Sequence, residues 1–146
     1  MERGNKVSVI RSVTGIILGT MFFRNEYDGH AIETSLKQVE RLTGRKIKVL
    51  AGDRGYRGKK DVNGTKIMIP GIPKKSDCCY QKQKKHKLFC KRAYIEPTIS
   101  HLKSDYRLGR NFYKDVVGDT VNMLLAVAAY NFQRAMKALW YMLQFG

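Results

Sequence analysis

The chain is poor in acidic residues. Its 146 residues include 12 Asp and Glu against 28 Lys and Arg, which leaves a formal charge of +16. A field of that sign attracts polyanions, so nucleic acid is the first class of partner to expect and an anionic membrane surface the second. Many small basic proteins use such a charge only for non-specific contact with RNA or DNA, and that interpretation stays open at this point.

Long apolar runs are also missing. The most apolar segment, residues 121–132, contains two asparagines and is soon followed by Arg134, so it is too short and too interrupted to span a bilayer. The first ten residues, MERGNKVSVI, lack the charged start and long apolar core of a signal peptide. We therefore expect a soluble, cytoplasmic protein with no membrane partner. The length and the 43% hydrophobic content suit one folded domain.

Cysteine is scarce, and its three copies make a poor disulfide framework. Cys78 and Cys79 are adjacent and Cys90 leaves the count odd. Together with His86 they could be written as a zinc set, but zinc ligands close in sequence are usually separated by two or more residues. The pattern favours unliganded thiols in a reducing compartment.

The amino-terminal third of the chain shows the pattern of an α/β fold. Residues 7–23 predict a β-hairpin, because two apolar runs flank a Thr-Gly turn. Apolar residues at helical spacing predict a helix over residues 30–44, and residues 47–51 form a short apolar strand. Asp53 follows that strand. In α/β domains functional sites gather at the carboxyl ends of strands, so Asp53 has a favourable position.

Asp53 has two interpretations at this stage. The tripeptide Asp-Arg-Gly is good turn chemistry, which fits an ordinary turn or cap residue. The position also fits a carboxylate that binds a metal ion. Position alone favours the turn residue, so the choice between these two interpretations depends on the rest of the sequence.

A basic run follows a short strand within TKIMIPGIP. Residues 74–92 contain eight Lys and Arg against a single acid, Asp77. A solvated helix face would explain the run, but so would a surface that follows a phosphate backbone. Contacts of the second kind position DNA without reading its sequence.

The stretch CKRAYIEPTISHLKSDYRLGRNF is the second informative segment. Pro97 suits the first turn of a helix, so we predict a helix that begins near Glu96. Arg92 and Lys103 would flank that acid on nearly the same face. One acid between two cations suits a phosphate and metal site, and it suits a surface ion pair equally well.

At these residues the chain resembles the DDE transposases of bacterial insertion sequences, in the branch with a Tyr-x2-Arg-x3-Glu-x6-Lys signature. Arg92, Glu96 and Lys103 match the spacing, and Phe89 stands at the tyrosine position. Four further segments are also similar to that family: YDGHAIETSLKQVERLTG, GDRGYRG, IEPTISHLKSDYRLGRNF and GDTVNMLLAVAAYNFQ. The resemblance covers nearly the whole chain, and several words in the right order are more specific than one spacing.

The resemblance implies a ribonuclease H-like fold and a role in DNA transposition, with metal-dependent strand cleavage and transfer at insertion-sequence ends. Asp53 would be the second catalytic acid and Glu96 the third, and both would bind Mg²⁺ or Mn²⁺ in a two-ion site. DNA would be the substrate and partner, and the protein would be associated with the nucleoid. The residues expected to bind DNA phosphates are Arg92, Lys103, Arg57 and Arg107.

The start of the chain departs from the family pattern. The first catalytic Asp of the family lies on a strand before the hairpin, and neither Glu2, Glu26 nor Asp28 occupies that place. We therefore expect the carboxyl-terminal part of a catalytic domain, with weak metal binding and impaired cleavage. The neighbours of the missing strand would expose a ladder edge. The expected segments are a hairpin, helix and strand at 1–53, a basic connecting region at 54–91 and a helical region at 92–146.

The remaining tail predicts one helix or a pair of helices with a broad apolar surface. Trp140, Tyr141 and Phe145 would pack into the core or against a partner protomer, and stacking on bases is the alternative. Three functions remain open: a transposase, an inactive transposase fragment that binds DNA or an intact transposase, and a basic nucleic-acid-binding protein.

Overall fold

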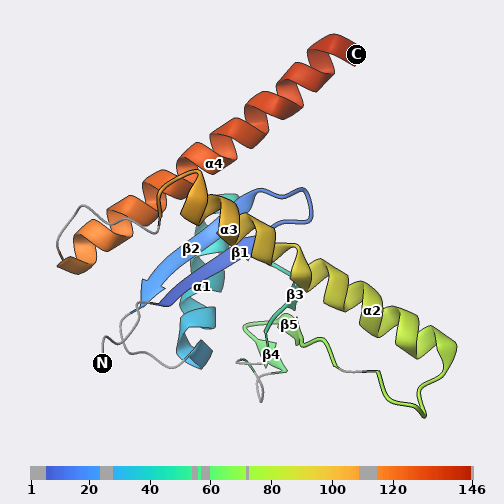
Figure 1. The fold of residues 1–146 in the computed structure, drawn as a ribbon. Coiled ribbons are helices and arrows are strands. Elements are labelled where there is room, and N and C mark those ends of the chain that lie inside the picture. Colours follow the sequence, from blue (N-terminus) through green and yellow to red (C-terminus); the bar gives the residue numbers. More distant parts are fainter. Residues whose placement is uncertain are drawn as a thin grey trace. The chain divides into compact units, whose positions relative to one another are not determined.

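The computed structural model describes residues 6–23, 28–53, 56, 60–71, 73–108 and 115–145. The chain forms two compact units. The first unit comprises Met1–Asn25 and Thr98–Gly146, and the second unit comprises Glu26–Pro97. Figure 1 shows small sheets combined with helices, in agreement with the predicted α/β class.

The first unit contains the predicted hairpin. Strands β1 (Lys6–Arg11) and β2 (Ile17–Phe23) pair antiparallel, so the prediction for residues 7–23 is confirmed. The turn between them requires glycine, because Gly15 has a φ of +94° and a Cβ there would lie 2.6 Å from the guanidinium carbon of Arg134.

Helix α4 (Asp115–Phe145) packs against β2 (Figure 1). It is one long helix, so of the two alternatives for the tail the single helix is correct. The core of the first unit joins this helix to the hairpin and to α3 (Ile95–Ser104). Its buried members are Ile17, Leu102, Ala126, Val127 and Tyr130.

A polar bracket fixes α4 to the start of β2. The Asn131 side chain accepts a hydrogen bond from the Ile17 amide at 2.9 Å and donates one to the Ile17 carbonyl at 2.8 Å. A guanidinium nitrogen of Arg134 donates to the Thr14 carbonyl at 3.0 Å. These bonds satisfy backbone groups of the first residue of β2 and of the turn that precedes it.

The second unit is built on helix α1 (Asp28–Thr43) and a three-stranded sheet. The helix confirms the prediction for residues 30–44, and it ends at Gly44 in the left-handed region. Ile32, Leu36 and Val39 are buried at helical spacing, whereas Leu42, which the pattern put on the same face, is exposed.

The sheet of the second unit has the order β3-β5-β4. Strand β3 (Val49–Ala51) is parallel to β5 (Thr65–Met68), and β4 (Asp61–Val62) is antiparallel to β5. The sequence reading did not predict β4. The Asn63-Gly64 turn, in which both residues have positive φ, is the hairpin signal that would have revealed it.

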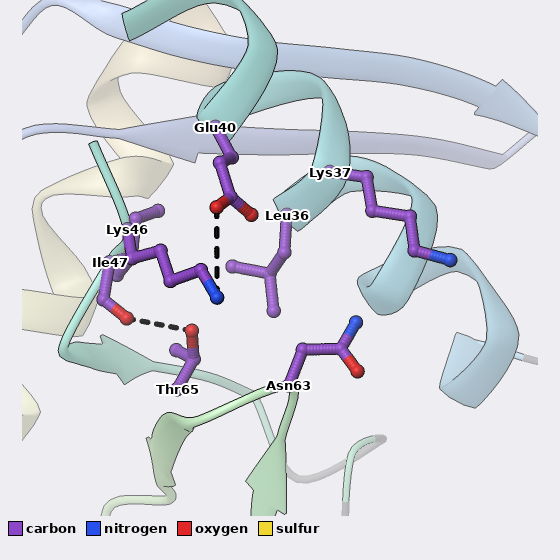
Figure 2. Close-up of a pocket in the computed structure, with 7 residues that line it drawn as sticks. All are labelled: Leu36, Lys37, Glu40, Lys46, Ile47, Asn63 and Thr65. Atoms are coloured by element: carbon purple, nitrogen blue, oxygen red, sulfur yellow. Dashed lines mark hydrogen bonds and ion pairs between the residues drawn. The ribbon is translucent and has the colours of Figure 1, made fainter. Parts of the chain in front are cut away.

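Figure 2 shows how α1 lies beside this sheet. A shallow hollow is lined by Leu36 on the helix and Thr65 on β5, and the Thr65 hydroxyl donates to the Ile47 carbonyl at 2.7 Å. Glu40 and Lys46 form a loose ion pair at 3.8 Å across its edge. These contacts hold the segment before β3 in place, and with it the strand that leads to Asp53.

The aromatic residues at the end of α4 do not pack as the core interpretation predicted. Trp140, Tyr141 and Phe145 are 60%, 63% and 80% exposed. The prediction that these side chains pack into the core is therefore wrong, because α4 extends beyond the segment that packs against its own unit. Packing against a partner protomer remains a prediction. Within the described residues no helix has the length and apolarity that crossing a membrane requires.

The Asn131 bracket gives a prediction about stability. The substitution Asn131→Asp removes the donor to the Ile17 carbonyl and places a carboxylate beside it, so we expect a loss of about 1–3 kcal/mol in the free energy of unfolding. Chemical denaturation followed by circular dichroism measures this loss. Asn122→Asp on the same helix is the matched control, and an equal loss in both variants would contradict the role of the bracket.

Candidate functional site

Asp53 lies just beyond the carboxyl end of β3, as the sequence predicts. The Gly52 amide donates to the Met68 carbonyl at 3.0 Å, which extends the pairing of β3 and β5 to the residue before Asp53. The Tyr56 amide donates to the Asp53 carbonyl at 3.1 Å. The backbone of Asp53 is thus fixed while its carboxylate is exposed.

Glu96 is positioned by the junction of two helices. Helix α2 (Cys79–Ala93) ends one residue before Tyr94, whose φ of −62° and ψ of −15° are helical, and α3 begins at Ile95. The helix start is thus one residue earlier than predicted. Pro97 falls in the first turn of α3, where its missing N–H costs no hydrogen bond. The near-continuity of α2 and α3 keeps Arg92 and Glu96 one turn apart.

The two carboxylates meet at one guanidinium. Arg92 Nη1 lies 2.8 Å from Glu96 Oε1, and Arg92 Nη2 lies 3.5 Å from Asp53 Oδ2. Both acidic side chains are 61% exposed, whereas that of Arg92 is 27% exposed. The structure therefore brings together three of the predicted site residues, one after β3, one in α2 and one in α3.

The chemical groups of this Asp53–Arg92–Glu96 cluster suit the binding of a metal ion and of a phosphate. Its carboxylate oxygens are hard donors with room for water, which suits Mg²⁺ or Mn²⁺. Its guanidinium offsets the repulsion between the acids and can form bidentate contacts with a phosphate. The described residues contain no group of three or more His, Cys, Asp or Glu placed to hold a metal ion. The cluster as described therefore offers two carboxylates.

Two of the other predicted phosphate-binding residues lie in the first unit, and the third is outside the described residues. Lys103 is exposed in the last turn of α3 and belongs to the first unit. Arg107 follows that helix, is exposed and has a φ of +55°. Arg57 lies outside the described residues. Phe89 is 53% exposed on α2, at the position that the resemblance assigns to tyrosine.

Helix α2 presents a basic surface. None of its residues is buried, which agrees with the solvated face predicted for residues 74–92. Lys84, Lys87 and Lys91 recur at i, i+3 and i+7 and are all exposed. Such a row of ammonium groups can contact successive phosphates.

Asp77 is a structural residue that the sequence reading missed. Its carboxylate accepts a hydrogen bond from the Lys74 amide at 2.7 Å and forms an ion pair with Lys85 at 2.5 Å. The hydrogen bond from Lys85 and then that from Lys74 hold the pKa of Asp77 below its usual value. The available signal was the acid two residues before a helix that is otherwise free of acids.

The thiols lie on or beside the same helix. Cys78, Cys79 and Cys90 are free, and the Cys90 sulfur lies 3.6 Å from His86 Nε2. The Cys78 amide donates to the Gln81 side chain at 3.2 Å, which helps begin α2.

Comparison with known proteins supplies the family. A search of curated proteins found no match, and a search of solved structures found none either. A family model described as the transposase DDE domain matches residues 4–132, which is most of the chain. The chain therefore belongs to the transposase DDE domain family.

Proposed function

We propose that this chain acts in DNA transposition, with Asp53 and Glu96 as metal-binding carboxylates for cleavage and transfer of strands at insertion-sequence ends. Membership of the transposase DDE domain family supports a transposition-related function. The assignment of these residues rests on the two ion pairs that Arg92 forms, one with each acid.

The residues present fit part of a divalent metal site. Both acids are exposed, so their oxygens can bind an ion that keeps several waters. When bound, divalent ions would activate the attacking water or 3′-hydroxyl and stabilise the leaving oxygen. A two-ion site needs more ligands than two carboxylates supply, so we expect weak affinity for Mg²⁺ or Mn²⁺ in the chain alone.

Arg92 has two roles in this proposal. Without an ion it neutralises the two acids and keeps them close. With DNA present, its planar guanidinium contacts a phosphate beside the acids, where a bidentate contact fixes the scissile group. Lys103, Arg107 and Arg57 would bind phosphates further along the strand, and α2 would follow the duplex backbone.

We also propose that the strands adopt a ribonuclease H-like arrangement. Among the described strands, β1 and β2 each have one edge without a ladder partner, and so do β3 and β4. Open edges of this kind suit strands that neighbour a further strand, and in the proposed fold that strand would carry a third carboxylate. The alternatives, an inactive fragment that associates with an intact transposase and a basic DNA-binding protein, use the same basic surface without cleavage.

The first prediction concerns Arg92. In Arg92→Ala the acids lose a competing cation, so we expect Mn²⁺ to bind about fivefold more tightly, equivalent to about 1 kcal/mol, while DNA binds more weakly. Electron paramagnetic resonance of free Mn²⁺ measures the first effect and fluorescence anisotropy of labelled duplex DNA the second.

Arg41→Ala, an exposed substitution on α1, is the control for the loss of one positive charge. It should leave Mn²⁺ affinity unchanged. Weaker Mn²⁺ binding in Arg92→Ala would argue that Asp53 and Glu96 do not share an ion.

The second prediction concerns DNA binding by α2. The triple variant Lys84→Ala, Lys87→Ala and Lys91→Ala should lower the slope of log affinity against log salt by about 2 to 3, because each lost phosphate contact removes about 0.9. The control removes three exposed lysines elsewhere in the second unit, at positions 48, 60 and 66. An equal change in both variants would mean that the basic charge acts without a specific surface.

The third prediction concerns catalysis. With two assigned carboxylates, the 146-residue chain should bind duplex DNA and leave it intact when Mg²⁺ or Mn²⁺ is added, as judged by a nicking assay on supercoiled plasmid. Metal-dependent nicking that is abolished by Asp53→Ala and unaffected by Glu40→Gln would contradict this prediction, and it would show that two acids suffice.

A further inference from the structure

Helix α4 has two apolar faces, and only one of them is covered by its own unit. The covered face consists of Met123, Ala126, Val127 and Tyr130, all at most 7% exposed. A second row of apolar residues lies on the opposite side of the helix and is exposed. Its members are Leu125, Ala129, Phe132, Met136, Leu139 and Leu143, called the outer stripe below.

The outer stripe has the spacing of a coiled-coil seam. Its members follow one another at intervals of 4, 3, 4, 3 and 4 residues, which is the alternation of a and d positions in a heptad repeat. Its five large side chains are between 49% and 75% exposed. The stripe spans 19 residues, or about 28 Å of helix at 1.5 Å per residue.

Charge is absent from the positions that flank this stripe. From Asn122 to Phe145 the only charged residues are Arg134 and Lys137, and the heptad places them at f and b, away from the seam. The flanking e and g positions carry alanine, glutamine, tryptophan and methionine. The stripe therefore has no basic residue that would attract an acidic partner. Two copies of the chain, each with a charge of +16, could also associate here without like charges facing each other across the seam.

We infer that the outer stripe is a dimerisation surface, and that its occupant is α4 of a second copy of this chain. A heptad seam is complementary to another seam of the same period, and α4 of a second copy supplies one of the same length. Five large side chains per copy, each losing on the order of 100 Å², would bury roughly 1,000 Å² in the dimer, close to the lower end of specific interfaces. The alanines at positions 128, 129 and 135 allow the helices to approach closely.

The salt dependence of this association distinguishes it from assembly on nucleic acid. Salt screens the repulsion between two basic chains and strengthens the burial of apolar groups, so the dimer should become tighter as NaCl rises. Chains held together by contaminating DNA should separate under the same change, because phosphate contacts weaken with salt. The inference is independent of the metal chemistry proposed above.

The experiment is sedimentation equilibrium of the full chain, treated with nuclease and kept reduced, at 0.15 M and 0.5 M NaCl. The wild type should dimerise at micromolar concentrations, more tightly at the higher salt. Leu139→Glu, in the stripe, should raise the dissociation constant at least tenfold. Leu124→Glu is the matched control, since Leu124 is 45% exposed against 49% for Leu139 but lies outside the stripe, and it should dimerise like the wild type.

Circular dichroism of all three proteins checks that α4 remains helical. A wild type that stays monomeric at 100 μM, the outcome expected if another segment or protein covers the stripe, would overturn the inference. A dimer that Leu139→Glu leaves intact, or that both substitutions weaken equally, would also overturn it.

Discussion

The guanidinium of Arg92 is the contact on which the candidate site depends. Two exposed carboxylates close to one another repel, and a chain with few acids has no general reason to place them together. Arg92 lies 2.8 Å from Glu96 and 3.5 Å from Asp53, and its partly buried position lets one charge compensate both. A divalent ion is a stronger and more compact source of the same compensation. The ion pairs therefore mark a place where such an ion would be stabilised.

The supporting structure fixes these three side chains from the backbone. Pairing of β3 with β5 brings the chain to Asp53, whose carbonyl accepts a hydrogen bond from the Tyr56 amide. The almost uninterrupted passage from α2 to α3 sets Arg92 one turn before Glu96. Asp77 anchors the other end of α2, the helix that carries Arg92. In the proposed function, phosphates bound along α2 would lead toward Arg92 and Glu96.

Much of this arrangement could be predicted from the sequence, and the failures have identifiable physical causes. The hairpin, α1 and the position of Asp53 followed from apolar periodicity and turn residues, which are local signals. The contact of Arg92 with Asp53 could not be predicted, because it joins elements about 40 residues apart and depends on how they pack. Strand β4 was missed because it is two residues long, although its Asn-Gly turn was visible. The aromatics of α4 were assigned to the core or to a partner protomer, because hydrophobicity alone does not distinguish a core from a surface that binds a partner.

The central claim is that Asp53 and Glu96 bind one divalent ion between them. Iron-mediated cleavage tests it directly: Fe²⁺ bound in place of Mg²⁺, with ascorbate and peroxide, cuts the polypeptide next to the site, and mass spectrometry locates the cuts. The account predicts cuts near both residue 53 and residue 96, suppressed by excess Mg²⁺ and absent in Asp53→Asn. Cuts at only one of these positions, or cuts that persist in Asp53→Asn, would contradict it.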